Sequence, residues 1–162
     1  SGRRRIAFIA GPGCNFDAAE RLRGYRDALA ELLPGVPEQV LPGRFDEASG
    51  MEAGTALLAA GTRPDAVFAA NDTMALGCLF AFNQAGLRVP QDIALAGFDD
   101  VPVARFVHPP LTTMRISIAE LGANALRRLL QDIQAQAPLA LPDPAPLVPE
   151  LVVRDSAPAA AL

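Results

Sequence analysis

The strongest constraint in the sequence is an alternation of short apolar runs and longer amphipathic segments. The apolar runs cover residues 6–10, 39–42, 65–70 and 93–98, and segments of helical period cover residues 17–33, 47–60 and 73–85. Residues 66–70 are apolar at every position, which is typical of a parallel strand that is covered on both faces. Four strand-then-helix units predict right-handed crossovers and an α/β fold, a doubly wound, mostly parallel sheet with helices on both faces.

The last third of the chain departs from this alternation. An extended stretch at 109–113 precedes a long amphipathic segment at 118–134, and a proline-rich link at 138–149 leads to a final strand at 151–154. The helix predicted at 118–134 has an unusually wide apolar stripe, with polar residues opposite. The stripe consists of Ile118, Leu121, Ala125, Leu126, Leu129, Leu130 and Ile133.

Length, charge and cysteine content exclude several classes of protein. A chain of 162 residues, about half of them apolar, is long enough for one compact domain. Its net charge of -4 argues against direct DNA binding, which needs a basic surface. Cys14 and Cys78 lie too far apart for a zinc motif, and no apolar run is long enough to cross a bilayer. We therefore expect a cytoplasmic protein without a cofactor, a metal or a membrane contact.

The candidate binding residues follow the predicted strands directly. In an open parallel sheet, ligands bind beyond the carboxyl ends of the strands, where loops and helix N-termini converge. Carboxylates and amides accept hydrogen bonds from hydroxyl groups, guanidinium and amide groups donate them, and an aromatic ring covers an apolar sugar face. The set therefore suits a polyhydroxylated small molecule. It consists of Asn15, Phe16, Asp17, Arg21, Phe45, Asp46, Asn71, Asp72, Asp99 and Asp100.

Each of these residues also has a purely structural interpretation. The aspartates are common helix caps and turn residues, Arg21 is suited to a solvated helix surface, and Phe45 could belong to the core. The turn Gly11-Pro12-Gly13 lacks the third glycine and the Gly-Lys-Ser/Thr of phosphate-binding loops, so it favours close strand-to-helix packing. His108 is the only histidine, and no serine or cysteine nucleophile accompanies it. The sequence therefore does not predict an enzyme.

Taken in order, the motifs resemble the C-terminal half of the effector-binding domain of the LacI/GalR family of transcriptional regulators, whose sensor has a periplasmic-binding-protein-like fold. The resemblance covers nearly all of residues 2–156. No single motif decides it, but the ordered set is specific. The motifs are residues 5–12 (RIAFIAGP), 20–25 (ERLRGY), 64–77 (PDAVFAANDTMALG), 86–93 (GLRVPQDI), 97–100 (GFDD), 110–113 (PLTT) and 153–156 (VRDS).

The resemblance implies specific roles for six residues. Arg21, Asn71 and Asp99 align with residues that hydrogen-bond the effector, and Phe45 aligns with an aromatic residue that stacks on it. Asn15 and Asp17 fall on a loop that lines the same cleft. Many sugar-binding relatives have a glutamine where this chain has Ile116, so an effector without a hydroxyl group at that point is conceivable.

The resemblance also implies a division of the chain. Residues 1–113 correspond to the C-terminal lobe and residues 114–136 to a crossover and long helix that belong to the other lobe. Residues 137–156 correspond to the link and return strand, and 157–162 to a tail. Operator DNA would be bound only through a helix-turn-helix head that this segment lacks. Dimer contacts are expected from the helix that starts at Met74 and from the turn at 101–106.

Two further expectations follow. The apolar stripe of the helix at 118–134 lacks its native partner lobe, so we expect the helix to fold back or to pair with another copy, for example by swapping. The main alternative function is a sugar-binding component of a transport system, which shares the fold. A small α/β enzyme is a third possibility, but it would need a poised nucleophile or base.

Overall fold

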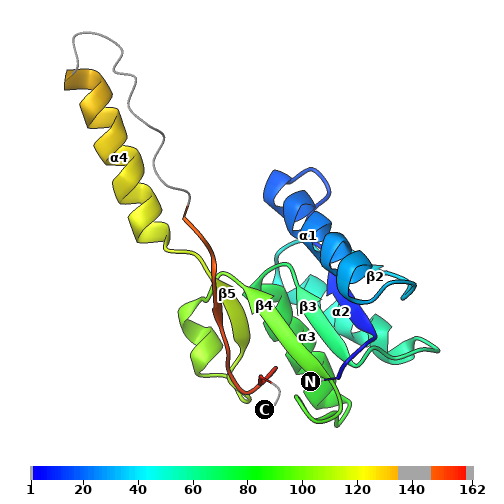
Figure 1. The fold of residues 1–162 in the computed structure, drawn as a ribbon. Helices are drawn as coiled ribbons and strands as arrows, with labels where there is room; N and C mark the ends of the chain where they lie inside the picture. Colours follow the sequence, from blue (N-terminus) through cyan, green and yellow to red (C-terminus); the bar gives the residue numbers. More distant parts are fainter. Residues whose placement is uncertain (1, 135–146, 160–162) are drawn as a thin grey trace.

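The computed structural model describes residues 2–134 and 147–159, which form one six-stranded sheet with helices on both faces (Figure 1). The strand order is β2-β1-β3-β4-β5-β6, and only β6 runs antiparallel to its neighbour. The predicted doubly wound, mostly parallel sheet is therefore confirmed. The elements are β1 (Ile6–Ile9), α1 (Phe16–Leu32), β2 (Gln39–Leu41), α2 (Glu47–Ala59), β3 (Ala66–Ala69), α3 (Asp72–Gln84), β4 (Ala94–Phe98), a 3-10 turn (Pro102–Arg105), β5 (Thr112–Arg115), α4 (Ile118–Gln134) and β6 (Glu150–Val152).

Strand β1 shows how the sheet is covered on both faces. Phe8 is fully buried and stacks on Tyr25 of α1, with ring centroids 5.1 Å apart. The Tyr25 hydroxyl donates to the Ile6 carbonyl at 2.8 Å, which fixes α1 on this face. The next residue, Ile9, points to the opposite face, because successive side chains alternate along a strand. That face is covered by α2 and α3 (Figure 1).

Two glycines allow α2 and α3 to pack closely. A side chain at Gly50 would overlap the backbone of Met74, and one at Gly77 would overlap the Glu47 carbonyl. The two helix backbones are thus in direct contact. This contact sets α3 firmly against the sheet and fixes the position of its N-terminus.

The alternation of strand and helix stops after β4. A single 3-10 turn with Pro102 at its start follows β4, in the region where the sequence predicts a turn at 101–106. Asp99 and Asp100 both have positive φ, 109° and 51°, so the chain turns sharply as it leaves β4. This turn brings the loop back over the N-terminus of α3.

Helix α4 has the predicted bounds, and it projects away from the sheet (Figure 1). It follows β5, which continues to Arg115, two residues past the lobe boundary expected at 113. The return strand β6 pairs with β5, with Arg115 opposite Glu150. Residues 135–146 of the expected link and residues 160–162 of the tail lie outside the described residues. Within the described ranges, no helix is long and apolar enough to cross a membrane.

Candidate functional site

The six residues that the resemblance singled out line one pocket at the carboxyl ends of the strands. The pocket has a volume of about 180 Å³ and opens to solvent. Its residues come from four separate strand-to-helix connections, which the parallel sheet brings to one edge. They are Asn15, Asp17, Arg21, Phe45, Asn71 and Asp99.

Arg21 lies at the centre of this pocket. Its guanidinium group donates to the Ala70 carbonyl at 2.5 Å and lies 3.3 Å from an Asp99 carboxylate oxygen. The guanidinium carbon is 3.9 Å from the centroid of the Phe98 ring and 5.8 Å from that of Phe45. Both distances are within the range of cation–π attraction. The side chain is only 17% exposed, so Arg21 is an ordered part of the site and not a solvated surface arginine.

Asp99 faces Arg21 from the turn after β4. Burial raises the pKa of its carboxyl group, while the charge and hydrogen bond of Arg21 act in the opposite direction. Its side chain is 39% exposed, which leaves acceptor capacity toward the pocket. The pair thus offers a cationic donor and an anionic acceptor next to each other.

Asn71 and Asn15 have structural roles as well as a place in the pocket. The oxygen of Asn71 caps α3 by accepting from the Met74 backbone N–H at 2.9 Å, and its amide nitrogen donates to the Phe45 carbonyl at 3.2 Å. Asn15 caps α1 in the same way through the Ala18 N–H. A primary amide has two donor hydrogens, so Asn71 keeps one N–H for another partner.

Phe45 has a positive φ of 66°, and its ring packs against Gly11. A side chain at Gly11 would overlap the ring, so the glycine of the first turn makes room for the aromatic residue. This agrees with the expectation that Gly11-Pro12-Gly13 serves close packing. Asp17 lies in the first turn of α1 and is exposed.

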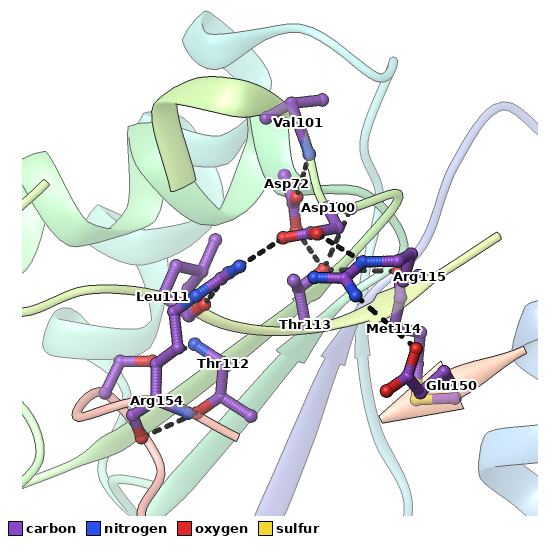
Figure 2. Close-up of polar contacts among 11 residues, drawn as sticks. Asp72, Asp100, Val101, Leu111, Thr112, Thr113, Met114, Arg115, Glu150 and Arg154 are labelled. Atoms are coloured by element: carbon purple, nitrogen blue, oxygen red, sulfur yellow. Dashed lines mark hydrogen bonds and ion pairs between the residues drawn. The ribbon is translucent and has the colours of Figure 1, made fainter. Parts of the chain in front are cut away.

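The other acidic candidates divide into distinct roles. Asp46 caps α2 by accepting from the Ser49 N–H at 2.7 Å. Asp72 and Asp100 lie beneath the turn, in a hydrogen-bonded network drawn in Figure 2. None of the three lines the pocket, so the structural interpretation holds for them. Phe16 is exposed and does not line it either.

Asp72 joins α3 to the turn and to β5. Its two oxygens accept from the Val101 N–H at 2.9 Å and the Thr113 hydroxyl at 2.6 Å (Figure 2). The residue is fully buried, and this burial raises its pKa to about 6, against the two hydrogen bonds that lower it. The network therefore connects the helix that carries Asn71 with the strand that leads to α4.

Asp100 joins the same turn to β5 and β6. Its two carboxylate oxygens accept hydrogen bonds from the guanidinium groups of Arg154, at 2.5 Å, and of Arg115, at 2.7 Å (Figure 2). Burial raises its pKa, but the hydrogen bonds from the two arginines outweigh that effect and leave the pKa below its usual range. Asp99 and Asp100 are adjacent, so the residue beside the pocket and the anchor of the strand pair are one peptide apart.

Phe98, whose ring lies 3.9 Å from the Arg21 guanidinium carbon, is not among the residues predicted from the sequence. It is the last residue of a strand, and the sequence prediction covers only residues that follow the strands. Its place directly before Asp99 was the available signal, because the last residue of a strand borders the site. Among the described residues, no group of three or more His, Cys, Asp or Glu side chains could hold a metal ion.

Comparison with known proteins places this architecture among repressors. Residues 1–157 match the family model of the periplasmic binding protein-like domain. The chain is 40% identical over 135 residues to the ribose operon repressor of Haemophilus influenzae, covering 83% of this chain and 41% of that protein. It is 39% identical over 157 residues to the HTH-type transcriptional repressor PurR of Pasteurella multocida, covering 96% and 46%.

A solved structure agrees. The lac repressor dimer bound to operator and the anti-inducer ONPF superposes with a TM-score of 0.87 at 34% identity, covering 98% of this chain and 54% of that one. The chain thus spans less than half the length of these two curated relatives and about half of the solved structure.

Proposed function

Since this chain belongs to the LacI/GalR family of transcriptional regulators, which have a periplasmic binding protein-like sensor domain, we propose that it forms part of an effector sensor. The effector is a small polyhydroxylated molecule, with a carbohydrate as the first choice. It binds at the carboxyl edge of the sheet between Arg21, Asn71 and Asp99. The observation that carries this proposal is that residues from four chain-distant turns line one pocket around an ordered Arg21.

The chemistry of the pocket fits such a ligand. Arg21 and the remaining N–H of Asn71 donate to ring or hydroxyl oxygens, and the Asp99 carboxylate accepts from hydroxyl groups. Phe45 presents a ring to the apolar face of a sugar. Arg21 is already held by Ala70 and Asp99, so little side-chain ordering remains to oppose binding.

The proposal includes no reaction. None of the described pocket residues is a serine, cysteine or histidine nucleophile. Effector binding acts by favouring one arrangement of the regulator over another, so that its affinity for operator DNA changes. DNA contacts are made by a head domain outside this segment, in the cytoplasm. The repressor names of the relatives favour this role over that of a transport component.

A dimer contact is proposed at α3 and at the turn of residues 101–106. Three large apolar side chains are exposed there, namely Phe80 of α3, Val103 of the 3-10 turn and Phe106 directly after it. Exposed apolar clusters of this kind mark protein–protein contacts. The lac repressor structure that resembles this chain is a dimer by its description.

The test is a thermal-shift screen with sugars and purines, run on the chain and on any longer gene product that contains it. A ligand that binds only the native state stabilises it, by about 2.7 kcal/mol at a concentration of one hundred times Kd, and therefore raises the melting temperature. Arg21→Ala should abolish that shift. Arg23→Ala is the matched control, because Arg23 lies on the same helix but pairs outward with Glu20 and Asp27. A shift that survives Arg21→Ala, or a screen in which no compound stabilises either protein, would contradict the proposal.

A further inference from the structure

The carboxyl edge of the sheet has three positive features at which an anion would ordinarily bind. Two are the N-termini of α1 and α3, because the N–H groups and the dipole of a helix N-terminus attract phosphates and carboxylates. The third is the guanidinium group of Arg21, since a guanidinium group can donate two parallel hydrogen bonds to such an anion. In this chain, all three are already occupied by groups of the chain itself.

The N-terminus of α1 is capped and carries an acidic residue. Asn15 accepts from the Ala18 N–H at 2.9 Å, and its own backbone N–H donates to the Pro12 carbonyl at 3.0 Å. Pro12 has no backbone N–H to donate. Asp17, in the first turn, adds a negative charge that offsets the partial positive charge of the helix end. The loop before α1 and the start of α1 are therefore poorly suited to bind a phosphate group.

The N-terminus of α3 is occupied in the same way. Asn71 caps it, and Asp72 places a buried carboxyl group in the first turn. Asp72 accepts hydrogen bonds from two uncharged groups, the Val101 N–H and the Thr113 hydroxyl. Burial is the main cause that raises its pKa to about 6, and the negative charge of Asp99 adds to this shift. At pH 7 the Asp72 carboxyl is mostly ionised, so a further negative charge lies behind the pocket.

Arg21 is held by three partners. Its guanidinium group donates to the Ala70 carbonyl and pairs with Asp99 at 3.3 Å. The ring of Phe98 lies 3.9 Å from the guanidinium carbon. An arriving anion would have to displace one of the two oxygen partners, or share Arg21 with the Asp99 carboxylate, which repels it. Arg21 is therefore available to neutral oxygen atoms more readily than to anions.

The charged residues that line the pocket have a negative total. Asp17 and Asp99 supply two carboxylates and Arg21 supplies one guanidinium group, which leaves one negative charge at pH 7. The two carboxylates affect each other, because burial raises the pKa of Asp99 and the charge of Asp17 raises it further. Asp99 is paired with Arg21. Asp17 is exposed, and within the part of the chain that the structure describes it forms no ion pair.

We propose that the effector of this chain carries no negative charge, and that Asp17 is the specificity-determining residue that excludes phosphorylated and carboxylated compounds. This proposal rests on the proposed effector function and narrows its ligand class to neutral or positively charged molecules. At about 4 Å in water, each negative charge of a ligand loses about fivefold in affinity beside one carboxylate, and more near a protein surface. A neutral hydroxyl group instead gains the oxygens of Asp17 as hydrogen-bond acceptors.

Titration with inorganic phosphate tests the exclusion directly. NMR spectra of the isotope-labelled chain are recorded at pH 7 and an ionic strength of about 0.1 M, where only charges within about 10 Å act on one another. A chloride series of equal ionic strength is the blank. The side-chain N–H signals of Arg21 and Asn71 report on the pocket. We expect the parent chain to bind phosphate too weakly to saturate.

Removal of the carboxylates should admit phosphate stepwise. In Asp17→Asn, the initial slope of the signal shift against phosphate concentration, which measures affinity, should rise at least about fivefold. Asp17→Asn combined with Asp99→Asn also releases Arg21 and should raise it further. An Asp17→Asn variant that binds phosphate no better than the parent would overturn the proposal, and so would saturating shifts of Arg21 and Asn71 in the parent.

Two further variants separate the charge of Asp17 from its other roles. Asp17→Glu keeps the charge and should behave like the parent. Glu31→Gln removes one negative charge from the same helix, but about 21 Å further along α1 at 1.5 Å per residue, and should also behave like the parent. A gain in Glu31→Gln as large as that in Asp17→Asn would show a general effect of net charge and would contradict the role of Asp17.

The thermal-shift screen gives a second readout. Every compound that stabilises the parent but not Arg21→Ala should lack phosphate and carboxylate groups, and a phosphorylated compound with this behaviour would overturn the proposal. A screen in which no compound stabilises the chain would contradict the effector function instead. The phosphate titration would still decide whether Asp17 excludes anions, so the two failures are distinguishable.

Discussion

The sheet region and helix α4 differ in how far their apolar residues are exposed to solvent. In the sheet region, Phe8, Leu57 and Phe82 are at most 1% exposed, whereas the large apolar residues of α4 are 46–69% exposed. Both regions have regular secondary structure with the bounds that periodicity predicts. The difference teaches that the periodic pattern of apolar residues determines where a helix or strand forms. Whether its apolar face is buried depends on the surface that packs against it, which the pattern does not identify.

If burial differs in this way, substitutions in the sheet region should lower the free energy of unfolding far more than substitutions in α4. The largest effect is expected at Phe8, which contacts Tyr25 and Phe68 inside the sheet. Phe8→Ala removes a fully buried ring and leaves a cavity, at a cost of about 3–5 kcal/mol in the free energy of unfolding. Urea denaturation measures this loss. A loss well below that range would mean that the core around β1 is loosely packed.

Asp72 gives the next largest effect, and it depends on pH. Its pKa is raised from 3.8 to about 6 in the folded chain. The protonated carboxyl is therefore favoured by folding, and its stabilisation is full below about pH 4 and lost as the pH rises through 6. A shift of about 2 units corresponds to at most about 3 kcal/mol.

Asp72→Asn removes this titration. The free energy of unfolding of the parent minus that of the variant should fall by up to about 3 kcal/mol between pH 4 and pH 7. Urea curves at stepped pH values measure the difference. A difference that stays flat or rises over this range would show that the Asp72 carboxyl is ionised in the folded chain at low pH.

A smaller effect is expected at the contact between α2 and α3. Gly77→Ala places a methyl group against the Glu47 carbonyl, and the helices must separate to admit it. Overpacking of this kind costs about 1–3 kcal/mol. Gly122→Ala on α4 is the matched control, because no atom lies within 4 Å of its added methyl group. Thermal melts of both variants measure the difference. Equal shifts in the melting temperature of Gly77→Ala and Gly122→Ala would contradict this prediction.

The smallest effect is expected on α4 itself. At concentrations dilute enough to separate copies, Leu129→Ala should change the unfolding free energy of the sheet by less than about 0.5 kcal/mol, as exposed substitutions do. Hydrogen exchange should likewise be fast in α4 and slow in β1 and β3, because local stability follows buried contacts. Slow exchange throughout α4 in a dilute monomer would show that the helix is packed against the rest of the chain.

The same contrast explains what could be read from the sequence. The strands, α1 and the bounds of α4 follow from local period, and the rule for parallel strand ends brought Arg21, Asn71 and Asp99 to one edge. Phe98 was missed because a buried strand residue and a site residue look alike in sequence. The links from Asp72 to Thr113 and from Asp100 to Arg154 join residues 41 and 54 positions apart, and no local pattern encodes such contacts.

The antiparallel ribbon of β5 and β6 has a mechanical consequence. The chain leaves the sheet toward α4 and comes back along two adjacent strands, which are tied to each other through Asp100, Arg115 and Arg154. Residues 112–114 of β5 are also paired with β4, so both connections to α4 are extended and anchored in the sheet and cannot lengthen. We expect any movement of α4 relative to the sheet to arise in the short connection at Ile116 and Ser117, and to depend on the Asp99–Asp100 turn, because Asp100 holds Arg115 at the start of that connection.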